Sequence, residues 1–361
     1  MSIVPKLSLL NPSLQRPSAL DSKPRSCESL WLDKNENLDP ELLAVNAAVL
    51  NSIPAIALAT YPEAGSLYRK LSKWVGVNQE SLLLTHGSDG AIRLTFEAFV
   101  QHGEGVIHTA PTFAMYQIYS QINGALVHRI DYEPSNNGPH LDVGKIVKLL
   151  RDCKPKLLCL PNPNSPTGTV IEPGVLYDLL KECERSGTVF LIDEAYHPFF
   201  DWTASPWTAT SRHLIIARTF AKAWGVAGLR IGYAIAHPDT VRLLHKIRPM
   251  YEVSTLAVEF MDRMLDKVTE MEKSVARINQ GKAYFTQEMR GLNFNTLQTY
   301  GNFVHVNFGD AGGKIHSALA GKVLYRSEFG DSCLKGFSRF SVAPPDIMFK
   351  VVKLIKTTLN N

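Results

Sequence analysis

The segment TFAKAWGVAGLR, residues 219–230, places a lysine in apolar surroundings. Such a setting lowers the pKa of an amine and leaves Lys222 nucleophilic toward an aldehyde. Thr219 supplies a hydroxyl and Arg230 a guanidinium, and both groups suit a phosphate held near the amine. For a lone lysine, the simpler alternative is a stem that lies along apolar surface with its ammonium in water.

A carboxylate and a phenol follow the apolar run TVFLID, residues 188–193. Asp193 ends that run, so its carboxylate is expected to be partly desolvated and to favour a cationic partner such as a protonated ring nitrogen. Tyr196 lies three residues further on. Asp is also a common helix N-cap after a strand, and the sequence leaves both interpretations open.

Two loops add polar groups after other apolar runs. Ser88 and Asp89 lie in a strand-to-helix turn, where the free amides of a helix start would face an anion. The segment PNPNSPTG, residues 161–168, contains three prolines that fix a rigid loop around Asn164. An ordinary structural turn explains the prolines equally well.

The elements that must position these groups are short apolar runs that alternate with helical stretches. The expected strands are residues 82–85, 105–109, 125–130, 157–161, 188–193 and 213–218. Near-continuous apolar strands suit a sheet covered on both faces, which indicates a mainly parallel α/β fold that binds ligands beyond the carboxyl ends of its strands. Residues 231–236 form a further strand whose direction the sequence leaves open.

The pattern changes after Pro249. We expect a long helical stretch over residues 255–291, strands over 302–308, 322–326 and 337–342, and a terminal helix from Pro345. This is the outline of a smaller α+β domain. The predicted division is an N-terminal arm and part of the small domain in 1–45, a large domain in 46–250 and the small domain in 251–361.

Composition excludes several classes of protein. The 361 residues are 45% hydrophobic and 20% charged with a net charge of +4, as in an ordinary globular chain, and no basic stripe points to nucleic acid. The five cysteines form no CxxC pair, which fits neither a disulfide framework nor a structural zinc site. No segment predicts a signal peptide or a membrane helix, so we expect a cytoplasmic protein.

Together the four segments meet the chemical needs of pyridoxal 5'-phosphate: an amine for the aldehyde, an acid for the ring nitrogen, polar groups for the ring oxygen and a phosphate cup. At this point the sequence resembles fold-type I aminotransferases of class I/II, and within them the histidinol-phosphate aminotransferase group. The matching pieces run in family order over almost the whole chain: LDKNEN (32–37), YPE (61–63), GSD (87–89), APTF (110–113), NPNSPTG (162–168), DEAY (193–196), TFAKAWGVAGLRIGY (219–233), KIRP (246–249) and SRFSV (338–342).

The resemblance implies a large domain with a mostly parallel seven-stranded sheet between helices, plus a smaller α+β domain. It also implies that Lys222 is the Schiff-base lysine and acts in proton transfer, and that Asp193 pairs with the pyridine nitrogen. The other implied cofactor contacts are Tyr196 and Asn164 at the ring hydroxyl, Phe113 on the ring face, Ser88, Asp89, Thr219 and Arg230 at the phosphate, and Tyr61 from a second subunit.

That last contact implies a homodimer with shared active sites. Arg326, Arg339 and Asn37 are the implied substrate residues, and the substrates are an amino donor and a 2-oxo acid acceptor. The implied reaction moves an amino group from an amino acid or a phosphorylated amine similar to histidinol phosphate.

The sequence departs from the family pattern at several positions. Ser165 stands where the family usually has Asn before Pro-Thr-Gly, so Asn164 or Ser165 contacts the ring oxygen. Ala221 replaces a common Ser, Thr60 replaces a common Arg, and residues 327–337 do not reproduce the usual spacing. These departures keep a related decarboxylase, similar to threonine-phosphate decarboxylase, as the alternative.

Three other classes fit less well. A nicotinamide-binding oxidoreductase needs GxGxxG after an early strand, whereas Gly225, Gly228 and Gly232 have the wrong spacing. The histidines are scattered and form no HExxH motif, which disfavours a metal hydrolase. A non-catalytic cofactor-binding protein is disfavoured because Lys222, Asp193, Tyr196 and Arg230 occur together.

Overall fold

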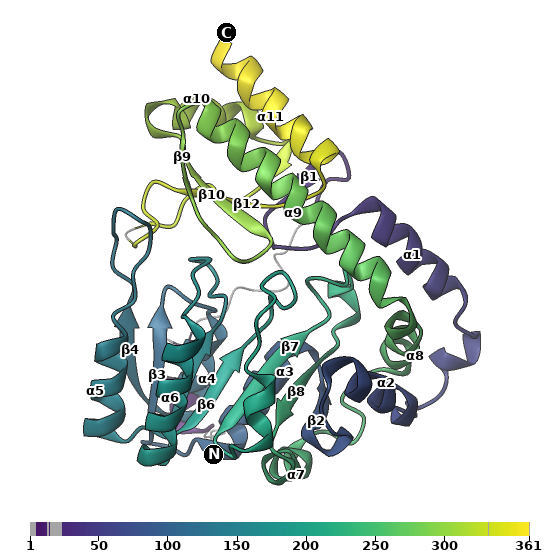
Figure 1. Ribbon diagram of the computed structural model, residues 1–361, viewed down its shortest axis with the longest axis vertical. Helices are drawn as coiled ribbons and strands as arrows, with labels where there is room; N and C mark the ends of the chain where they lie inside the picture. Colours follow the sequence, from purple (N-terminus) through teal and green to yellow (C-terminus); the bar gives the residue numbers. More distant parts are fainter. Residues whose placement is uncertain (1–4, 13, 15–23, 331, 361) are drawn as a thin grey trace.

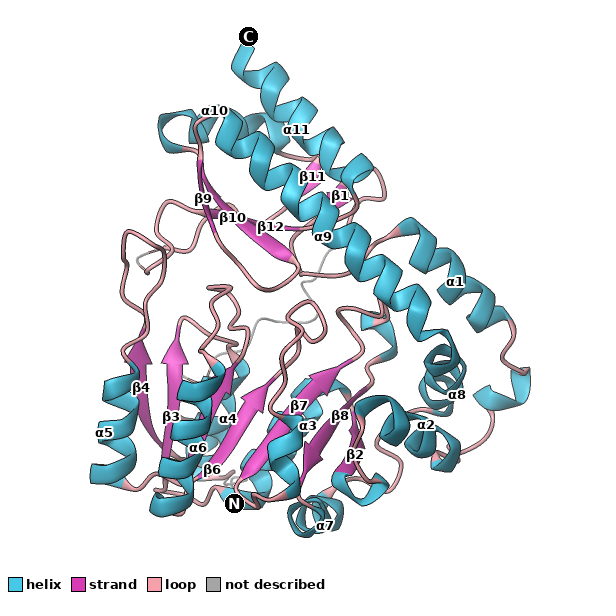
Figure 2. Ribbon diagram, in the orientation of Figure 1, coloured by secondary structure: helices cyan, strands magenta, loops and turns pink. Residues whose placement is uncertain are grey.

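The computed structural model describes residues 5–12, 14, 24–330 and 332–360. Figures 1 and 2 show a large layered part built on a wide sheet, and above it a smaller part in which long helices cover a narrow sheet. Part of the N-terminal arm that we predict within residues 1–45 lies outside the described residues.

The large part contains a seven-stranded sheet with the order β2-β8-β7-β6-β5-β3-β4. Neighbouring strands from β7 to β4 are parallel, whereas β8 runs antiparallel to both β7 and β2. The strands are β2 (Leu82–Thr85), β3 (Gly105–Ala110), β4 (Leu126–Asp131), β5 (Leu157–Pro161), β6 (Val189–Asp193), β7 (Leu214–Thr219) and β8 (Gly232–Ala236). The prediction of an α/β fold with a mostly parallel seven-stranded sheet is confirmed.

The direction of β8, which the sequence left open, follows from its short connection to β7. Residues 220–231 contain only the single turn η5 (Ala227–Leu229), too little chain for a crossover helix. The chain therefore turns back, and the amide of Phe220 donates to the carbonyl of Ile231 at 3.1 Å. Lys222 lies in this tight connection, at the edge where β6 and β7 end.

Helices cover both faces of the sheet, which explains why its strands are apolar on both sides. Successive residues of β6 alternate between two cores: Phe190 and Ile192 pack in one, Val189 and Leu191 in the other. The first core is covered by α1 (Pro40–Asn51), α2 (Gly65–Val75), α5 (Val143–Cys153), α6 (Pro173–Ser186) and α8 (Thr255–Met264), and the second by α3 (Gly87–Phe99), α4 (Met115–Asn123) and α7 (Pro238–Ile247).

The smaller part has its own core around an antiparallel sheet of order β12-β10-β9. Its elements are α9 (Val268–Gly291), β9 (Asn295–Leu297), β10 (Phe303–Asn307), α10 (Gly312–Leu319), β11 (Val323–Leu324), β12 (Ser338–Ser341) and α11 (Pro345–Asn360). From the start of the chain, β1 (Leu30–Trp31) pairs in parallel with β11, and Leu32 enters the same core.

The helical stretch expected over 255–291 is two helices rather than one. A 3-10 turn, η6 (Leu265–Lys267), separates α8 from α9. The break lets α8 bury Phe260 and Met264 in the core of the large sheet, whereas α9 packs along α11 and buries Phe285 in the smaller core.

The domain limits that we predict remain a proposal. Leu42 of α1 and Met264 of α8 both belong to a core of the large sheet, so side-chain packing does not change at residue 45 or at residue 250. Within the described parts of the chain, the helices are all too short or too polar to cross a membrane.

Gly281 allows the closest approach between α9 and the segment before α11. It is buried, and a Cβ at this position would overlap the carbonyl oxygen of Ala343. We expect Gly281→Ala to lower the free energy of unfolding by about 1–3 kcal/mol, the usual cost of overpacking. Urea unfolding monitored by circular dichroism measures the change.

Gly291→Ala is the matched control, because nothing lies within 4 Å of a Cβ at the end of the same helix. Helix propensity predicts an unchanged or slightly higher stability for this variant, by up to about 1 kcal/mol. Equal loss in both variants would contradict the proposed close contact.

Candidate active site

A cavity of about 450 Å³ lies beyond the carboxyl ends of β6 and β7. Its walls come from those strand ends, the start of α3, the proline-rich loop, the segment 33–36 and β12. Ten candidate site residues from the sequence analysis line it: Ser88, Asp89, Phe113, Ser165, Asp193, Tyr196, Thr219, Lys222, Arg230 and Arg339. The structure thus brings together groups from widely separated segments.

Lys222 presents its amine to this cavity. Its Nζ donates to the carbonyl oxygen of Lys34 at 2.9 Å and lies 6.0 Å from the ring centroid of Tyr196. Desolvation, aided by the nearby charge of Arg339, lowers the pKa of Lys222 to about 8, although the carboxylate of Glu36 opposes this shift. A substantial fraction of the amine is therefore neutral near neutral pH, the form that attacks carbonyl carbons.

Asp193 is a buried carboxylate with two hydrogen-bond donors. The backbone amide of Ala195 donates to Oδ1 at 3.0 Å, and the hydroxyl of Tyr116 donates to Oδ2 at 3.0 Å. Desolvation raises the pKa of Asp193 to about 6, although both hydrogen bonds act in the opposite direction. A cation placed beside this carboxylate would be stabilised by it.

The start of α3 and the residues beside it suit an anion. Gly87 begins α3 with a φ of 74°, and a Cβ there would lie 3.2 Å from Nη2 of Arg230 and 3.9 Å from Oγ1 of Thr219. The missing side chain keeps the helix start open beside these two donors, while Ser88 and Asp89 follow in the first turn. A helix start, a guanidinium and a hydroxyl together form a phosphate-binding arrangement.

Arg339, on β12, provides a second cationic group to the lining of the cavity. Its Nη2 donates to the carbonyl oxygen of Asp33 at 2.8 Å, and its Nε is buried without a hydrogen-bond partner in the described part of the chain. Burial lowers the pKa of Arg339, so its guanidinium gains from an anionic partner. Arg326 pairs with Arg339 through the backbone but is exposed and does not line the cavity.

The proline-rich loop presents Ser165 rather than Asn164 to the cavity. Asn164 is fully buried: its Oδ1 accepts from Thr112 at 2.9 Å, and its Nδ2 donates to the carbonyl of Pro111 at 3.0 Å and to Thr167 at 2.7 Å. The Asn164 amide therefore holds the loop. Of the two residues that the sequence left open, Ser165 is the one positioned to reach a ligand.

Besides Arg326 and Asn164, two further predicted residues do not line this chain's cavity. Asn37 is buried, and its Nδ2 donates to the carbonyl of Ala223 and to Oγ of Ser274, each at 3.0 Å. Tyr61 is 72% exposed and stacks on Tyr251 with ring centroids 4.2 Å apart. Their predicted roles at the substrate and at a partner's cofactor stay predictions.

Sequence reasoning missed two residues that support the site. Asn35 has a positive φ of 55° and donates from Nδ2 to the hydroxyl of Tyr196 at 2.7 Å. Tyr116 supplies the hydrogen bond to Asp193 already described. Its partner lies 77 positions away along the chain, so no local signal in the sequence indicated this contact.

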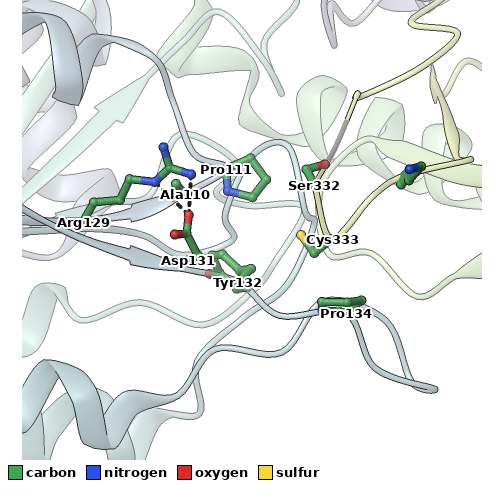
Figure 3. A pocket seen from close by; sticks show the side chains of 9 residues that line it. Ala110, Pro111, Arg129, Asp131, Tyr132, Pro134, Ser332 and Cys333 are labelled. Atoms are coloured by element: carbon green, nitrogen blue, oxygen red, sulfur yellow. Dashed lines mark hydrogen bonds and ion pairs between the residues drawn. The ribbon is translucent and has the colours of Figure 1, made fainter.

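A second cavity has a volume of about 670 Å³ (Figure 3). In this view Arg129 and Asp131, joined by an ion pair, approach from β4, while Ser332 and Cys333 face them from the segment before β12. None of the predicted catalytic or cofactor residues lines this cavity. We therefore assign the chemistry to the cavity that contains Lys222.

The fold and this site define an enzyme of the fold-type I class. The chain belongs to the aminotransferase class I and II family, because residues 28–347 match the model of that family. It is 31% identical over 324 residues to histidinol-phosphate aminotransferase 2 of Ralstonia nicotianae, a match that covers 87% of this chain and 84% of the relative. The recognition from sequence is confirmed.

Solved structures share the fold at lower identity. The histidinol-phosphate aminotransferase of Sinorhizobium meliloti, in complex with pyridoxal-5'-phosphate, matches with a TM-score of 0.76 and 19% identity over 91% of each chain. The L-threonine-O-3-phosphate decarboxylase of Porphyromonas gingivalis matches with a TM-score of 0.72 and 18% identity over 92% of this chain and 100% of that one.

The family depends on pyridoxal 5'-phosphate, which confirms the predicted cofactor. The residues present fit it. The open helix start at Gly87 matches a phosphate, the buried carboxylate of Asp193 matches a protonated ring nitrogen, and the amine of Lys222 matches an aldehyde.

The lowered pKa of Lys222 predicts the pH at which its amine reacts. Labelling of the cofactor-free protein with dilute acetic anhydride between pH 6 and pH 11 should modify Lys222 with a midpoint near pH 8, because the neutral form is the nucleophile. Quantitative peptide mass spectrometry measures each lysine separately.

Lys148 is the internal control, because its ion pair with Asp152 raises its pKa above the usual lysine value. Its midpoint should therefore lie well above that of Lys222. Coincident midpoints for the two lysines would rule out the desolvated amine.

Proposed function

We propose that this enzyme moves an amino group from an amino acid or a phosphorylated amine similar to histidinol phosphate to a 2-oxo acid. The observation that carries the proposal is one cavity lined by the amine of Lys222, by the buried carboxylate of Asp193 and by cationic groups that suit anions. Thr219 and Arg230 belong to the phosphate-binding arrangement, and Arg339 is a second guanidinium in the same cavity. The histidinol-phosphate aminotransferase relatives support this choice of donor.

Pyridoxal 5'-phosphate, when bound, supplies an aldehyde that links to amines and a ring that draws electrons from the substrate α-carbon. Asp193 keeps a positive charge on the ring nitrogen favourable. Ser88, Asp89, Thr219 and Arg230 would hold the phosphate, Phe113 would contact the ring, and Tyr196 with Ser165 would contact the ring oxygen. These assignments rest on the family resemblance and on the placement of the side chains around the cavity.

Lys222 would move the proton. Its neutral amine would take a proton from the substrate α-carbon as a general base, and the ammonium group so formed would then serve as the general acid. The low pKa of Lys222 suits this double role, since it lies close to the working pH. Arg339 binds the anionic group of the substrate, and its buried Nε would then gain a partner.

A decarboxylase is the second candidate. The structural likeness to a threonine-phosphate decarboxylase favours it, as does the unusual spacing in residues 327–337. In that reaction the anion contacts would turn the carboxylate, rather than the hydrogen, perpendicular to the cofactor ring.

The first test offers L-histidinol phosphate, aromatic amino acids and O-phospho-L-threonine to the purified holoenzyme with 2-oxoglutarate. We expect formation of glutamate and no release of carbon dioxide. Lys222→Ala should lower the rate by about 100-fold or more, because general acid–base catalysis is lost. Lys148→Ala, on the exposed surface of α5, should leave the rate unchanged. Carbon dioxide without glutamate would establish the decarboxylase instead.

We propose further that the enzyme is a cytoplasmic homodimer. An exposed apolar surface surrounds Tyr61: Ile56 is 64% exposed, Leu58 78% and Met250 77%. A surface of this kind fits a second copy of the chain. Because Tyr61 does not line its own chain's cavity, a contact with the cofactor would have to be made across the dimer.

Mixing two variants tests the shared site. Lys222→Ala and Tyr61→Ala are each prepared alone, then unfolded, mixed and refolded together. In a mixed dimer one site would combine Lys222 of one subunit with Tyr61 of the other, so activity should rise to about a quarter of the parent value, since half of the dimers are mixed and each has one intact site. No rise above the separately refolded variants would exclude sharing.

A further inference from the structure

Tyr116 contacts the acid of the proposed site without touching the cavity itself. Its hydroxyl lies 3.0 Å from Oδ2 of Asp193, and its side chain is completely buried. The other donor to this carboxylate, the amide of Ala195, is part of the backbone. Among the hydrogen bonds of the described residues, Tyr116 is thus the side-chain donor to Asp193.

Packing against the segment before α4 orients the ring that carries this hydroxyl. The ring of Tyr116 packs edge-on against that of Phe113, with centroids 5.9 Å apart and an interplanar angle of 85°. The side chain that would lie on the cofactor ring therefore also buttresses the side chain that holds Asp193.

We propose that Tyr116 is a positioning residue that keeps Asp193 ionised and aimed at the ring nitrogen of the cofactor. This inference rests on the proposed role of Asp193. With one lone pair on each oxygen already engaged, the carboxylate cannot rotate freely, and its remaining lone pairs are left for the ring N–H.

Tyr116 is suited to be a permanent donor. Burial, together with the charge of Asp193, raises the pKa of its phenol well above the usual value, so the hydroxyl keeps its proton at working pH. Without this donor, a fully desolvated carboxyl would favour its neutral form still more strongly. A neutral Asp193 cannot stabilise a positive charge on the ring.

The other groups that face Asp193 do not replace this function. Asp89 on α3 and the adjacent Glu194 are acidic and raise its pKa. The thiol of Cys159 on β5 has a raised pKa, caused by burial and by Asp193, and stays neutral. Lys222 and Tyr196 also interact electrostatically with Asp193, but the amine of Lys222 is needed to react with the cofactor aldehyde.

The test compares Tyr116→Phe with the parent protein. Phe keeps the ring and its packing while removing the hydroxyl. Cofactor affinity is measured by quenching of tryptophan fluorescence between pH 5 and pH 9, first with pyridoxal 5'-phosphate and then with its analogue that has carbon in place of the ring nitrogen.

Cofactor affinity should fall on acidification as Asp193 takes up a proton, and we call this fall the acid limb. Its midpoint should move up by about one pH unit in Tyr116→Phe, because the carboxylate has lost a charge-assisted hydrogen bond. Affinity for pyridoxal 5'-phosphate at pH 7 should fall by about tenfold. Affinity for the carbon analogue should not fall, because that ring carries no proton for Asp193 to stabilise.

Tyr119→Phe is the matched control. Tyr119 lies one turn further along α4, is also buried, and donates to a different carboxylate, that of Asp89, at 3.1 Å. Its removal should leave the acid limb at the parent position. An equal shift in both variants would show that loss of either hydroxyl simply disturbs α4, and would overturn the proposal.

A second substitution should strengthen the hydrogen bond to Asp193 instead of removing it. 3-Fluorotyrosine at position 116 has a more acidic phenol and donates more strongly, so the acid limb should move below that of the parent. Equal loss of affinity for both ligands in Tyr116→Phe, or no shift in either Tyr116 variant, would overturn the proposal. A parent protein that binds no pyridoxal 5'-phosphate would instead overturn the proposed function itself.

Discussion

Desolvation of one cavity is the constraint on which the proposed chemistry depends. It acts on an acid and a base at once and disfavours the charged form of each, so the pKa of Asp193 rises to about 6 and that of Lys222 falls to about 8. Two groups that in water would titrate far apart are thus brought to either side of neutral pH. Asp193 is thus suited to a ligand with a positive charge, and Lys222 to a ligand with a reactive carbonyl.

The sheet explains why these two groups meet. Parallel strands β6 and β7 are neighbours in register, with Asp193 opposite Ala217, so the segments that follow them leave the same edge. The reversal into β8 then keeps Lys222 close to that edge instead of sending the chain into a helix. The chemistry therefore depends on a topological feature, the antiparallel strand, as much as on the residue types.

The sequence predicted the large sheet and the cavity lining well, because apolar strands and glycine or proline punctuation are local signals. Asp193 and Thr219 end strands, and Lys222 and Arg230 lie in the connection between β7 and β8, so the strand pattern places them. Asn37, in contrast, is a predicted substrate residue that lies outside the cavity lining. Its surroundings come from Ala223 and from Ser274 of α9, and no local pattern reveals packing between segments so far apart.

The residues that sequence reasoning missed are also residues whose partners lie far away along the chain. The partner of Tyr116 lies 77 positions away, and the partner of Asn35 lies 161 positions away. Similarly, the choice between Asn164 and Ser165 depended on the side chain of Thr112, which occupies the Asn164 carbonyl. Sequence spacing gives the types of residue that a site needs, whereas only the folded chain shows which amide is already engaged.

The pairing of β1 with β11 has a consequence for synthesis of the protein. The segment that contacts Lys222 and Tyr196 follows β1, and Asn35 is further held by Ser341 of β12. On the ribosome, these early residues meet their partners only after β12 has emerged, since Asn35 and Ser341 are 306 positions apart. A nascent chain that stops short of β12 therefore lacks part of the pocket lining.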